Sequence, residues 1–420
     1  MAENTSISVL MIGHVWPEVT SSAAGVRELG LVRGFLKKGW RVFYVSPSKN
    51  NDHRVRLDLL GVETAQFEPN DSGFDTWLSQ IQPDFVIFDR FMIEEQFSFR
   101  VREVCPDAVR VLDTIDLHLL RRFRQQNPDP KAVQTPLWDS EDASRELASI
   151  FRSDLSLILS DSEVQLLRSS LGLPESLLQE SLELCRIFYN SPPAQPPGFS
   201  ERQHFSMIGN FRHAPNADAV LWLKKEIWPA IRGLLPNAEV HVYGAYPPKE
   251  MMDLTDAKAG FYVKGWTPDA CGTLAQYRVN LAPLRFGAGI KGKILDGWWA
   301  GTPPVTTSIG AEGMAGLLPW GGLVADTAEA FAKGAVQLYQ SPDLWADAVR
   351  KGRDILNQEY DFDSQSTRLV EKLLEVRSEL QGRRARNWAG AMLWHHLHKS
   401  TTYFSRWIEA KNRPASSQIQ

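Results

Sequence analysis

Residues 283–314 read PLRFGAGIKGKILDGWWAGTPPVTTSIGAEGM, and this stretch decides the fold that we expect for the chain. An apolar run at 279–282 leads into a loop with two glycines, and a segment with helical spacing of apolar residues follows that loop. Gly301 then suits a helix end, and the β-branched run 305–307 predicts another strand. Strand, helix and strand in this order indicate a parallel sheet covered by helices.

The glycine loop, which we define as residues 286–290, carries residue types that suit the capture of a diphosphate. Gly287 and Gly289 permit close approach of the backbone, and N–H groups at a helix start can face an anion. Lys291 and Lys293 supply positive charge, and Asp296, one turn later, is placed to accept from a ribose hydroxyl. The alternative interpretation is a tight turn followed by solvated lysines.

Apolar runs recur along the whole chain at the rhythm of alternating strands and helices. They predict strands at 7–12, 42–45, 85–88, 109–112 and 155–159, and again at 205–208, 240–243, 261–263, 279–282, 305–307 and 323–325. Apolar residues with helical spacing lie between them, at Leu29, Val32, Leu36, Val220, Leu223, Ile227 and Ile231. We therefore predict an α/β protein whose 420 residues form two tandem Rossmann-like, doubly wound domains that face a cleft.

A proline-rich stretch at 190–198 separates the two halves and is typical of a linker. We predict a first domain at 1–190, a second at 191–381, a terminal helical segment at 382–413 and a disordered tail at 414–420. The terminal segment holds the apolar residues Trp388, Leu393, Trp394, Leu397, Phe404, Trp407 and Ile408. Docking on the first domain is the use that we favour for them, and contact with a membrane surface is the alternative.

Composition excludes several classes of protein. A net charge of −4 gives no overall attraction to nucleic acid, and three widely spaced cysteines argue against a disulfide scaffold. His395 and His398 share a helical face, but no carboxylate or cysteine joins them or His396 at ligand spacing, so we predict no metal site. The sequence has no signal-peptide form and no apolar run long enough for a membrane span. We expect a cytoplasmic protein, held at most on the membrane surface.

The stretch 283–314 resembles the nucleotide-sugar site of the retaining glycosyltransferases of family 4, often called glycosyl transferases group 1. The resemblance implies the GT-B architecture, in which the glycine loop and the following helix start hold the leaving diphosphate and a carboxylate in that helix holds the ribose. Many members carry two glutamates separated by seven residues here. If Asp296 stands for the second glutamate, the first falls on Ala288, so one carboxylate of the pair is missing.

The same resemblance points to further residues. Family members often have a basic loop after the first strand of the second domain, where this chain offers Arg212 and Asn216, and we add Glu312 of the second glycine turn to the donor-binding set. Some members carry a histidine that touches the transferred sugar, which makes His118, with Asp116 beside it, our catalytic candidate. Ser22 and Gly25, at the next helix start, are candidates for contact with a phosphate or the acceptor. Ordinary helix capping by serine is the alternative for that position, and a structural hydrogen bond is the alternative for His118.

The activity that the resemblance implies is transfer of a sugar from a nucleotide diphosphate sugar to an acceptor hydroxyl, with retention of configuration. The expected donor is a UDP-sugar or a GDP-sugar, and neither a metal nor another cofactor is required, because lysine and arginine can neutralise the diphosphate. The acceptor is a saccharide, a lipid-linked hydroxyl or another hydroxyl compound. Two alternatives stay open: a nucleotide-sugar epimerase of the same fold, and a binding protein that has kept the fold and lost turnover.

Overall fold

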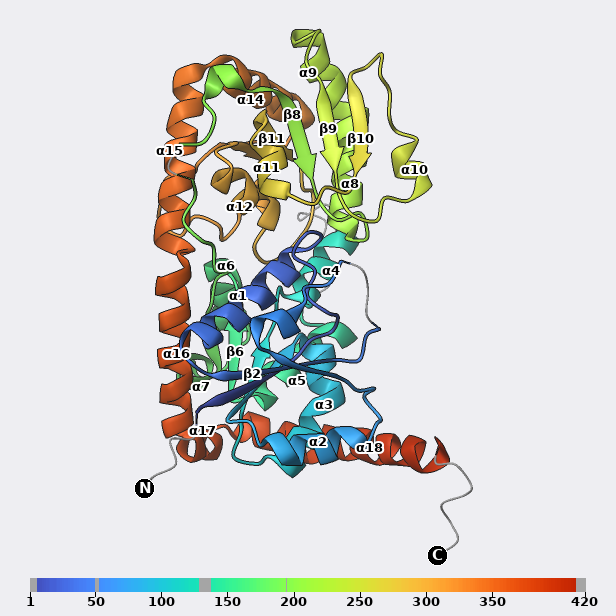
Figure 1. Cartoon of the computed structure of the whole chain (residues 1–420), viewed down its shortest axis with the longest axis vertical. Coiled ribbons are helices and arrows are strands. Elements are labelled where there is room, and N and C mark those ends of the chain that lie inside the picture. Colours follow the sequence, from blue (N-terminus) through green and yellow to red (C-terminus); the bar gives the residue numbers. More distant parts are fainter. Residues whose placement is uncertain (1–5, 50–52, 128–136, 194, 413–420) are drawn as a thin grey trace, which may run out of the picture.

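The computed structural model describes residues 6–49, 53–127, 137–193 and 195–412, apart from the side chains of 396–399 and 412. It consists of two α/β domains, one above the other in Figure 1. Each domain is built on one sheet whose paired strands are all parallel. The predicted fold class is confirmed.

The first sheet has the strand order β3-β2-β1-β4-β5-β6-β7. Its strands are β1 (Ser8–Ile12), β2 (Arg41–Ser46), β3 (Glu63–Gln66), β4 (Phe85–Asp89), β5 (Val109–Asp113), β6 (Leu155–Ile158) and β7 (Leu182–Leu184). Strand β1 lies inside the sheet and every residue in it is buried, which explains the apolar run that follows Ser8. Chain order reverses between β1 and β4, so the loops that follow these strands diverge and leave a ligand position at the carboxyl ends.

The second sheet has the order β10-β9-β8-β11-β12-β13. Its strands are β8 (Gln203–Ile208), β9 (Val240–Tyr243), β10 (Phe261–Gly265), β11 (Tyr277–Ala282), β12 (Pro304–Thr306) and β13 (Leu323–Val324). Strands β8 and β11 are neighbours, with Phe205 opposite Val279. The loop after β8 and the glycine loop after β11 therefore leave the sheet side by side, where the strand order reverses.

Helices cover both sheets, and their bounds are as follows. The first domain contains α1 (Ala23–Lys37), α2 (Gly73–Ile81), α3 (Phe91–Val104), α4 (His118–Gln126), α5 (Glu141–Arg152), α6 (Asp161–Ser170) and α7 (Glu175–Ser181). The second contains α8 (Ala214–Trp222), α9 (Trp228–Leu234), α10 (Lys249–Met252), α11 (Ala270–Leu274), α12 (Gly292–Trp299), α13 (Ser308–Ala311), α14 (Ala328–Gln340) and α15 (Pro342–Glu359). A π-helical turn, Leu223–Ile227, joins α8 to α9 and keeps the predicted apolar stripe buried.

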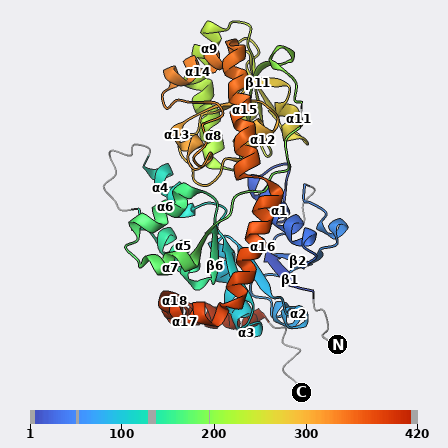
Figure 2. The ribbon, with the colours of Figure 1, turned by 90° about the vertical axis from the view of Figure 1, so that its left-hand side faces the viewer.

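The chain crosses between the domains twice, and the two crossings touch. The Tyr189 N–H donates to the Tyr360 carbonyl at 2.8 Å, and the Phe362 N–H donates to the Tyr189 carbonyl at 3.0 Å. After the second crossing, α16 (Phe362–Ser378) packs on α1, and α18 (Trp388–Asn412), reached through α17 (Leu380–Arg386), packs on α5. Figure 2 shows α15 and α16 running along one side of both domains.

We propose the first domain boundary at 190, where the first crossing lies. The second crossing lies at 360–362, before the predicted boundary at 381, because α16 already packs on α1 of the first domain. The predicted tail at 414–420 falls outside the described residues. Within the described part of the chain, no helix has both the length and the apolar character that crossing a bilayer requires.

All eleven predicted strands are present, and β3 and β7 are additions. Both added strands lie at the edges of the first sheet. Strand β3 is mostly exposed and has the sequence ETAQ, while β7 has only three residues. An edge strand needs fewer apolar side chains than a strand inside the sheet. Strands β3 and β7 therefore lack the continuous apolar run that predicts a buried strand.

Candidate functional site between the two domains

The glycine loop lies against the first domain. Gly289 has φ +63°, a left-handed conformation that favours glycine, and a Cβ added there would lie 2.7 Å from the Cβ of Asp116. At the start of α12, a Cβ on Gly292 would lie 2.6 Å from the Cβ of Ala23, the first residue of α1. The two glycines are therefore required by close approach between domains, and the start of α12 faces the start of α1.

Two N–H groups of this segment are engaged by protein atoms. The Gly289 N–H donates to Glu163 Oε1 of the first domain at 2.9 Å, and the Lys291 N–H donates to the sulfur of Met314 at 3.2 Å. The sequence predicts that N–H groups of this loop face an anion. These two N–H groups bond protein atoms in the structure, and anion binding by the loop stays a prediction. The positive charge of the site therefore comes chiefly from lysine side chains.

Lys291 and Lys293 are cations that have no carboxylate partner within ion-pair distance among the described residues. Lys291 is buried and its Nζ donates to the Gly289 carbonyl at 2.7 Å, while the Nζ of Lys293 donates to the Asn216 side-chain oxygen. Burial lowers the pKa of Lys291 to about 8, and burial together with the charge of Lys291 lowers the pKa of Lys293 to about 7. A bound anion would offset the cost of burying these two charges.

Asp296 lies on α12, one turn beyond the lysines, and is oriented by a residue of the linker. The Tyr189 hydroxyl donates to Asp296 Oδ1 at 2.6 Å. Burial raises the pKa of Asp296 to about 6, and the bond from Tyr189 and the charge of Lys293 oppose that rise. Because Tyr189 also joins the two chain crossings, the position of this carboxylate is tied to the junction between the domains.

The loop after β8 brings Asn216 and Arg212 to different places. Asn216 is buried beside Lys293, and its side-chain nitrogen donates to the Asn210 carbonyl at 2.8 Å. Arg212 is exposed, with its guanidinium carbon 3.7 Å from the centre of the Tyr246 ring. Tyr246 in turn donates to Glu18 Oε2 of the first domain at 2.8 Å. Asn216 therefore joins the lysines, whereas Arg212 lies at the outer edge of the domain contact.

The loop after β5 places His118 and Asp116 opposite the glycine loop. Both are buried, and His118 Nε2 lies 3.3 Å from Asp116 Oδ1, an oxygen that has no hydrogen-bond partner among the described residues. Burial lowers the pKa of His118 to about 4, so the imidazole is neutral near pH 7. Burial would raise the pKa of Asp116, but the neighbouring charge of Arg121 reverses the shift and keeps it below its ordinary value. A neutral imidazole and a buried carboxylate oxygen without a partner are both suited to bind hydroxyl groups.

This loop is strained and is held by two buried carboxylates. Ile115 has φ +62°, a conformation that is costly for a β-branched residue and is often retained at functional sites. Glu146 accepts from the His118 and Leu119 N–H groups at 3.0 and 2.8 Å, which caps α4. Glu163 accepts from the Leu117 N–H at 2.9 Å and, with the same oxygen, from the second domain. Neither glutamate stands in a recognisable motif, so neither was predicted from the sequence.

Glu312 and Ala288 make contacts that differ in kind. Arg124 of α4 bonds both Glu312 oxygens, at 2.7 and 2.8 Å, and also donates to the Gly287 carbonyl at 2.9 Å. Ala288, where the first glutamate of the family pair would fall, packs against the apolar core of the first domain. Ala288 is partly buried there, so a glutamate at position 288 would lose part of its hydration.

The last predicted positions, Ser22 and Gly25, are at the start of α1. Ser22 Oγ accepts from the Gly25 N–H at 3.0 Å, the bond of an ordinary helix cap. A Cβ on Gly25 would lie 2.5 Å from the Glu18 backbone, so glycine is required by the turn itself. Next to them, Asn210 of the second domain donates to the Ser21 carbonyl at 3.2 Å. A ligand role for Ser22 and Gly25 stays a prediction.

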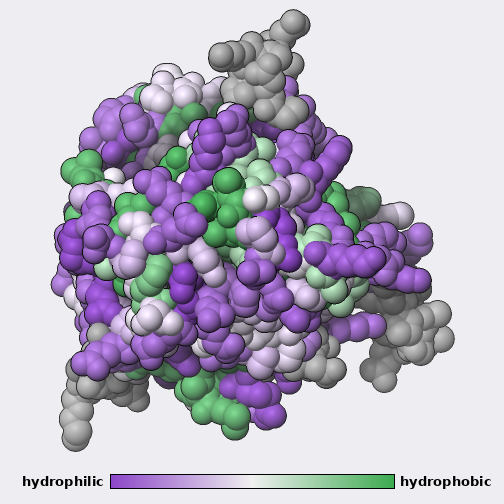
Figure 3. Space-filling view, turned by 90° about the horizontal axis from the view of Figure 1, so that it is seen from above, coloured by the Kyte–Doolittle hydropathy of each residue, from purple (hydrophilic) through white to green (hydrophobic). Residues whose placement is uncertain are grey.

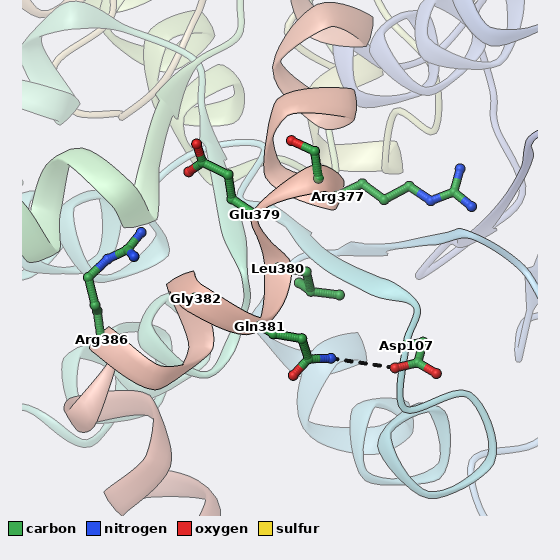
Figure 4. A pocket seen from close by; sticks show the side chains of 8 residues that line it. Asp107, Arg377, Glu379, Leu380, Gln381, Gly382 and Arg386 are labelled. Carbon is green, nitrogen blue, oxygen red and sulfur yellow. Dashed lines mark hydrogen bonds between the residues drawn. The ribbon is translucent and has the colours of Figure 1, made fainter.

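Other candidate sites are less well supported. Among the described residues, no group of three or more histidine, cysteine, aspartate or glutamate side chains is arranged to hold a metal ion. His396 and His398 have side chains outside the described set, and His395 is exposed. A surface cavity of about 580 Å³ lies at the turn between α16 and α17 (Figure 4), but its arginines are already paired, Arg377 with Asp84 and Arg386 with Glu180.

Comparison with known proteins agrees with the predicted fold. Residues 202–341 match the model of the family described as Glycosyl transferases group 1. This matched stretch contains the glycine loop, both lysines, Asp296, Glu312, Arg212 and Asn216. No curated protein sequence matches the chain.

Solved structures with the same two-domain architecture span nearly the whole chain. A mutant of S. aureus TarM in complex with fondaparinux, alpha-GlcNAc-glycerol and UDP superimposes with a TM-score of 0.68 at 9% identity, covering 88% of this chain and 99% of that one. Sucrose-phosphate synthase from Thermosynechococcus elongatus gives 0.65 at 12% identity, covering 89% and 99%. HepE from Anabaena, in complex with UDP and glucose, gives 0.65 at 12% identity, covering 88% and 100%. The chain therefore has the GT-B fold.

Proposed function

We propose that this chain, which has the GT-B fold and matches the Glycosyl transferases group 1 family over residues 202–341, transfers a sugar from a nucleotide diphosphate sugar to an acceptor hydroxyl. The observation that carries the proposal is the pair Lys291 and Lys293 behind the glycine loop. Burying two cations without a carboxylate partner costs free energy in the unliganded protein, and a diphosphate bound beside them would offset that cost. TarM and HepE, which share the fold, were solved with UDP.

The chemistry asked of these residues is stabilisation of charge on the leaving diphosphate. When the bond between the sugar and the diphosphate breaks, negative charge grows on phosphate oxygens beside the two ammonium groups, which are held in place before the reaction. The acceptor oxygen forms the new bond to the sugar, and its proton passes to an oxygen of the departing phosphate on the same face. That same-face route retains configuration and needs no protein nucleophile, no metal ion and no other cofactor.

The first domain supplies the proposed contacts to the sugar. His118 is neutral near pH 7 and can accept from or donate to a sugar hydroxyl, and Asp116 Oδ1 has a free lone pair at the same place. In the second domain, Asp296 is the proposed partner of the ribose, and Asn216 holds Lys293. The donor is a UDP-sugar or a GDP-sugar, the sugar is of the hexose type, and the acceptor is a saccharide, a lipid-linked hydroxyl or another hydroxyl compound. We place the reaction in the cytoplasm.

The first test is a panel of thermal-unfolding measurements with UDP, GDP and their sugars. A ligand present at about a hundred times its dissociation constant should add about 2.7 kcal/mol to the free energy of unfolding. The second test follows donor consumption with and without an added acceptor such as glucose or a glycerol glycoside. Consumption that requires the acceptor and disappears in Lys293→Ala supports transfer.

The other outcomes decide between the alternatives. A new nucleotide sugar formed without acceptor would make the chain an epimerase, and tight nucleotide binding without turnover would make it a binding protein. Absence of any thermal shift with both nucleotide families would overturn the assignment of the site itself.

A further inference from the structure

The outer side of α18 is an exposed apolar surface. Five residues, which we call the aromatic face, lie on it: Trp388 is 56% exposed, Met392 53%, Tyr403 66%, Phe404 62% and Trp407 56%. The spacings 388 to 392 and 403 to 407 are one helical turn each, and the step of eleven between 392 and 403 is close to three turns, so Trp388, Met392, Tyr403 and Trp407 share one side of the helix. Phe404 follows Tyr403 directly and joins this surface at its edge, where its ring stacks on Trp407 with ring centres 6.0 Å apart. Single exposed apolar residues are common, but a set aligned on one helix indicates an interaction surface.

The aromatic face is not what holds α18 on the protein. The opposite side of the helix does that: the Trp394 indole donates to the Arg152 carbonyl at 3.1 Å, and Arg100 of the first domain pairs with Glu409. Arg406 lies five helical turns from Trp388, at the edge of the aromatic face, and adds an ion pair with Glu103 at 2.6 Å. Docking on the first domain, the use that we favoured from the sequence, therefore accounts for one side of α18 and leaves the other without a partner in the described chain.

The charges beside the aromatic face are basic. Residues 380–412 contain six lysines and arginines and one acidic residue. Arg384, Arg386 and Arg406 are paired with acidic residues of the first domain, so Lys411 is the exposed cation of α18 that has no ion pair among the described residues. The acidic residue is Glu409, which is turned inward to Arg100 with its side chain 13% exposed. Among the described side chains of α18, the exposed charged ones are Arg406 and Lys411, and Lys411 Nζ lies 5.2 Å from the Trp407 ring centre. A partner for this surface should therefore be apolar with negative charge at its edge.

We propose that the aromatic face of α18 rests on an anionic lipid bilayer. Tryptophan and tyrosine rings favour the depth of the lipid headgroups, and lysine and arginine beside them pair with lipid phosphates. The opposite end of the molecule, seen from above in Figure 3, shows mostly hydrophilic residues with only small hydrophobic groups between them.

The placement of α18 fits a role in attachment. Arg384, just before α18, pairs with Asp154, which precedes β6, so this helix lies where the strands of the first sheet begin. The glycine loop and the His118 loop lie where strands end, on the other side of the first domain (Figure 1). A bilayer under α18 would hold the protein at the membrane and leave the interdomain site open to the solution. This inference goes beyond the proposed function and does not depend on it.

The test is flotation of the full chain with vesicles, in the absence of nucleotide. One set contains phosphatidylcholine alone, and the other contains equal parts of phosphatidylcholine and phosphatidylglycerol. We expect binding to the anionic set, and a fall of about tenfold or more for the double variant Phe404→Ala and Trp407→Ala, because two rings leave the interface. Lys411→Gln should lower binding about fivefold on anionic vesicles and hardly at all on neutral ones.

Matched controls keep the result interpretable. Leu317 on the second domain is fully exposed, and Leu317→Ala should bind vesicles like the parent chain. The double variant should keep the parent's circular dichroism and melting temperature, since its side chains point away from the first domain.

A parent chain that does not float with anionic vesicles, or a double variant that floats equally well, would overturn the proposal. A third outcome would also overturn it: a parent chain that is a dimer in solution and does not bind vesicles, together with a double variant that is a monomer. That outcome would assign the aromatic face to contact with a second copy of the chain. None of these outcomes bears on nucleotide binding, which is measured separately.

Discussion

Arg27 on α1 and the lysine pair on α12 are basic residues near two helix starts that touch each other, yet their surroundings differ. Arg27 is 1% exposed, bonds both oxygens of Asp113 at 2.8 and 2.9 Å and donates to the Cys185 carbonyl at 2.7 Å. Lys291 and Lys293 have a carbonyl and an amide oxygen as partners. We infer that Arg27, which is paired with a buried carboxylate, stabilises the fold. We infer that Lys291 and Lys293, which have no carboxylate partner among the described residues, bind a ligand.

The largest expected effect is on stability, and it tests the pairing of Arg27 with Asp113. Arg27→Ala should lower the free energy of unfolding by about 3–5 kcal/mol, because it leaves the Asp113 carboxylate buried and without its partner. Urea unfolding followed by circular dichroism measures the loss. Arg33 lies exposed on the same helix, and Arg33→Ala should change stability by no more than about 0.5 kcal/mol. Equal losses in the two variants would show that the pairing of Arg27 does not matter to the fold.

The second prediction concerns Lys293 and its proposed role in binding the donor. Lys293→Ala should weaken donor binding or transfer by about 10²–10³-fold, since it removes a preorganised charge from the diphosphate. The same variant, without ligand, should be as stable as the parent or up to about 2 kcal/mol more stable, because a desolvated cation is gone. Calorimetry with UDP-glucose or GDP-mannose and thermal unfolding give the two values.

Lys333 is the matched control for this variant. It is a surface lysine of the same domain, 70% exposed and paired with Glu329, and Lys333→Ala should leave both measurements unchanged. Loss of stability in Lys293→Ala, together with unaltered donor affinity, would reverse the comparison and make Lys293 a structural residue.

The lysines of α12 could be predicted from the sequence, whereas the ion pair of Arg27 on α1 could not. The lysines follow two glycines directly after a buried strand, and a local pattern of that kind predicts both the element and its chemistry. The pairing of Arg27 with Asp113 joins residues 86 positions apart and needs the fold to be known. The same holds for Glu163 and Tyr189, whose contacts with Gly289 and Asp296 bring distant segments together.

The strands were predicted well because burial on both faces of a parallel sheet gives continuous apolar runs. Arg212 illustrates the limit of that approach. Motif spacing placed it with the diphosphate, but spacing does not say which way a side chain turns, and in this conformation the guanidinium lies over Tyr246. Its predicted role in binding the donor stays a prediction, and that role would require the stacked contact to open.

The third prediction is a pH dependence of donor affinity. The pKa values of Lys291 and Lys293 are about 8 and about 7 in the free protein, and a bound diphosphate raises both, so binding takes up protons. Affinity should be greatest below pH 7 and should fall as the pH rises through these two values, by about tenfold or more in total between pH 6 and 9. The ligand should be a nucleotide sugar, because its diphosphate carries no terminal phosphate group that titrates in this range. A flat profile, or one that rises with pH, would contradict the lowered pKa values.

The smallest expected effect involves Arg124, a cation that has a carboxylate partner, as Arg27 has, but is partly exposed to solvent. Arg124 reaches across the domain boundary to Glu312, with the side chains 23% and 30% exposed, and an ion pair of that exposure contributes about 1 kcal/mol or less. Arg124→Ala should therefore weaken donor binding by no more than about fivefold, through looser placement of the glycine loop. A double-mutant cycle with Glu312→Ala should give a coupling of similar size. If Arg124→Ala instead matched the loss in Lys293→Ala, the charge that binds the diphosphate would come from the first domain, and the division between paired and unpaired cations would no longer locate the site.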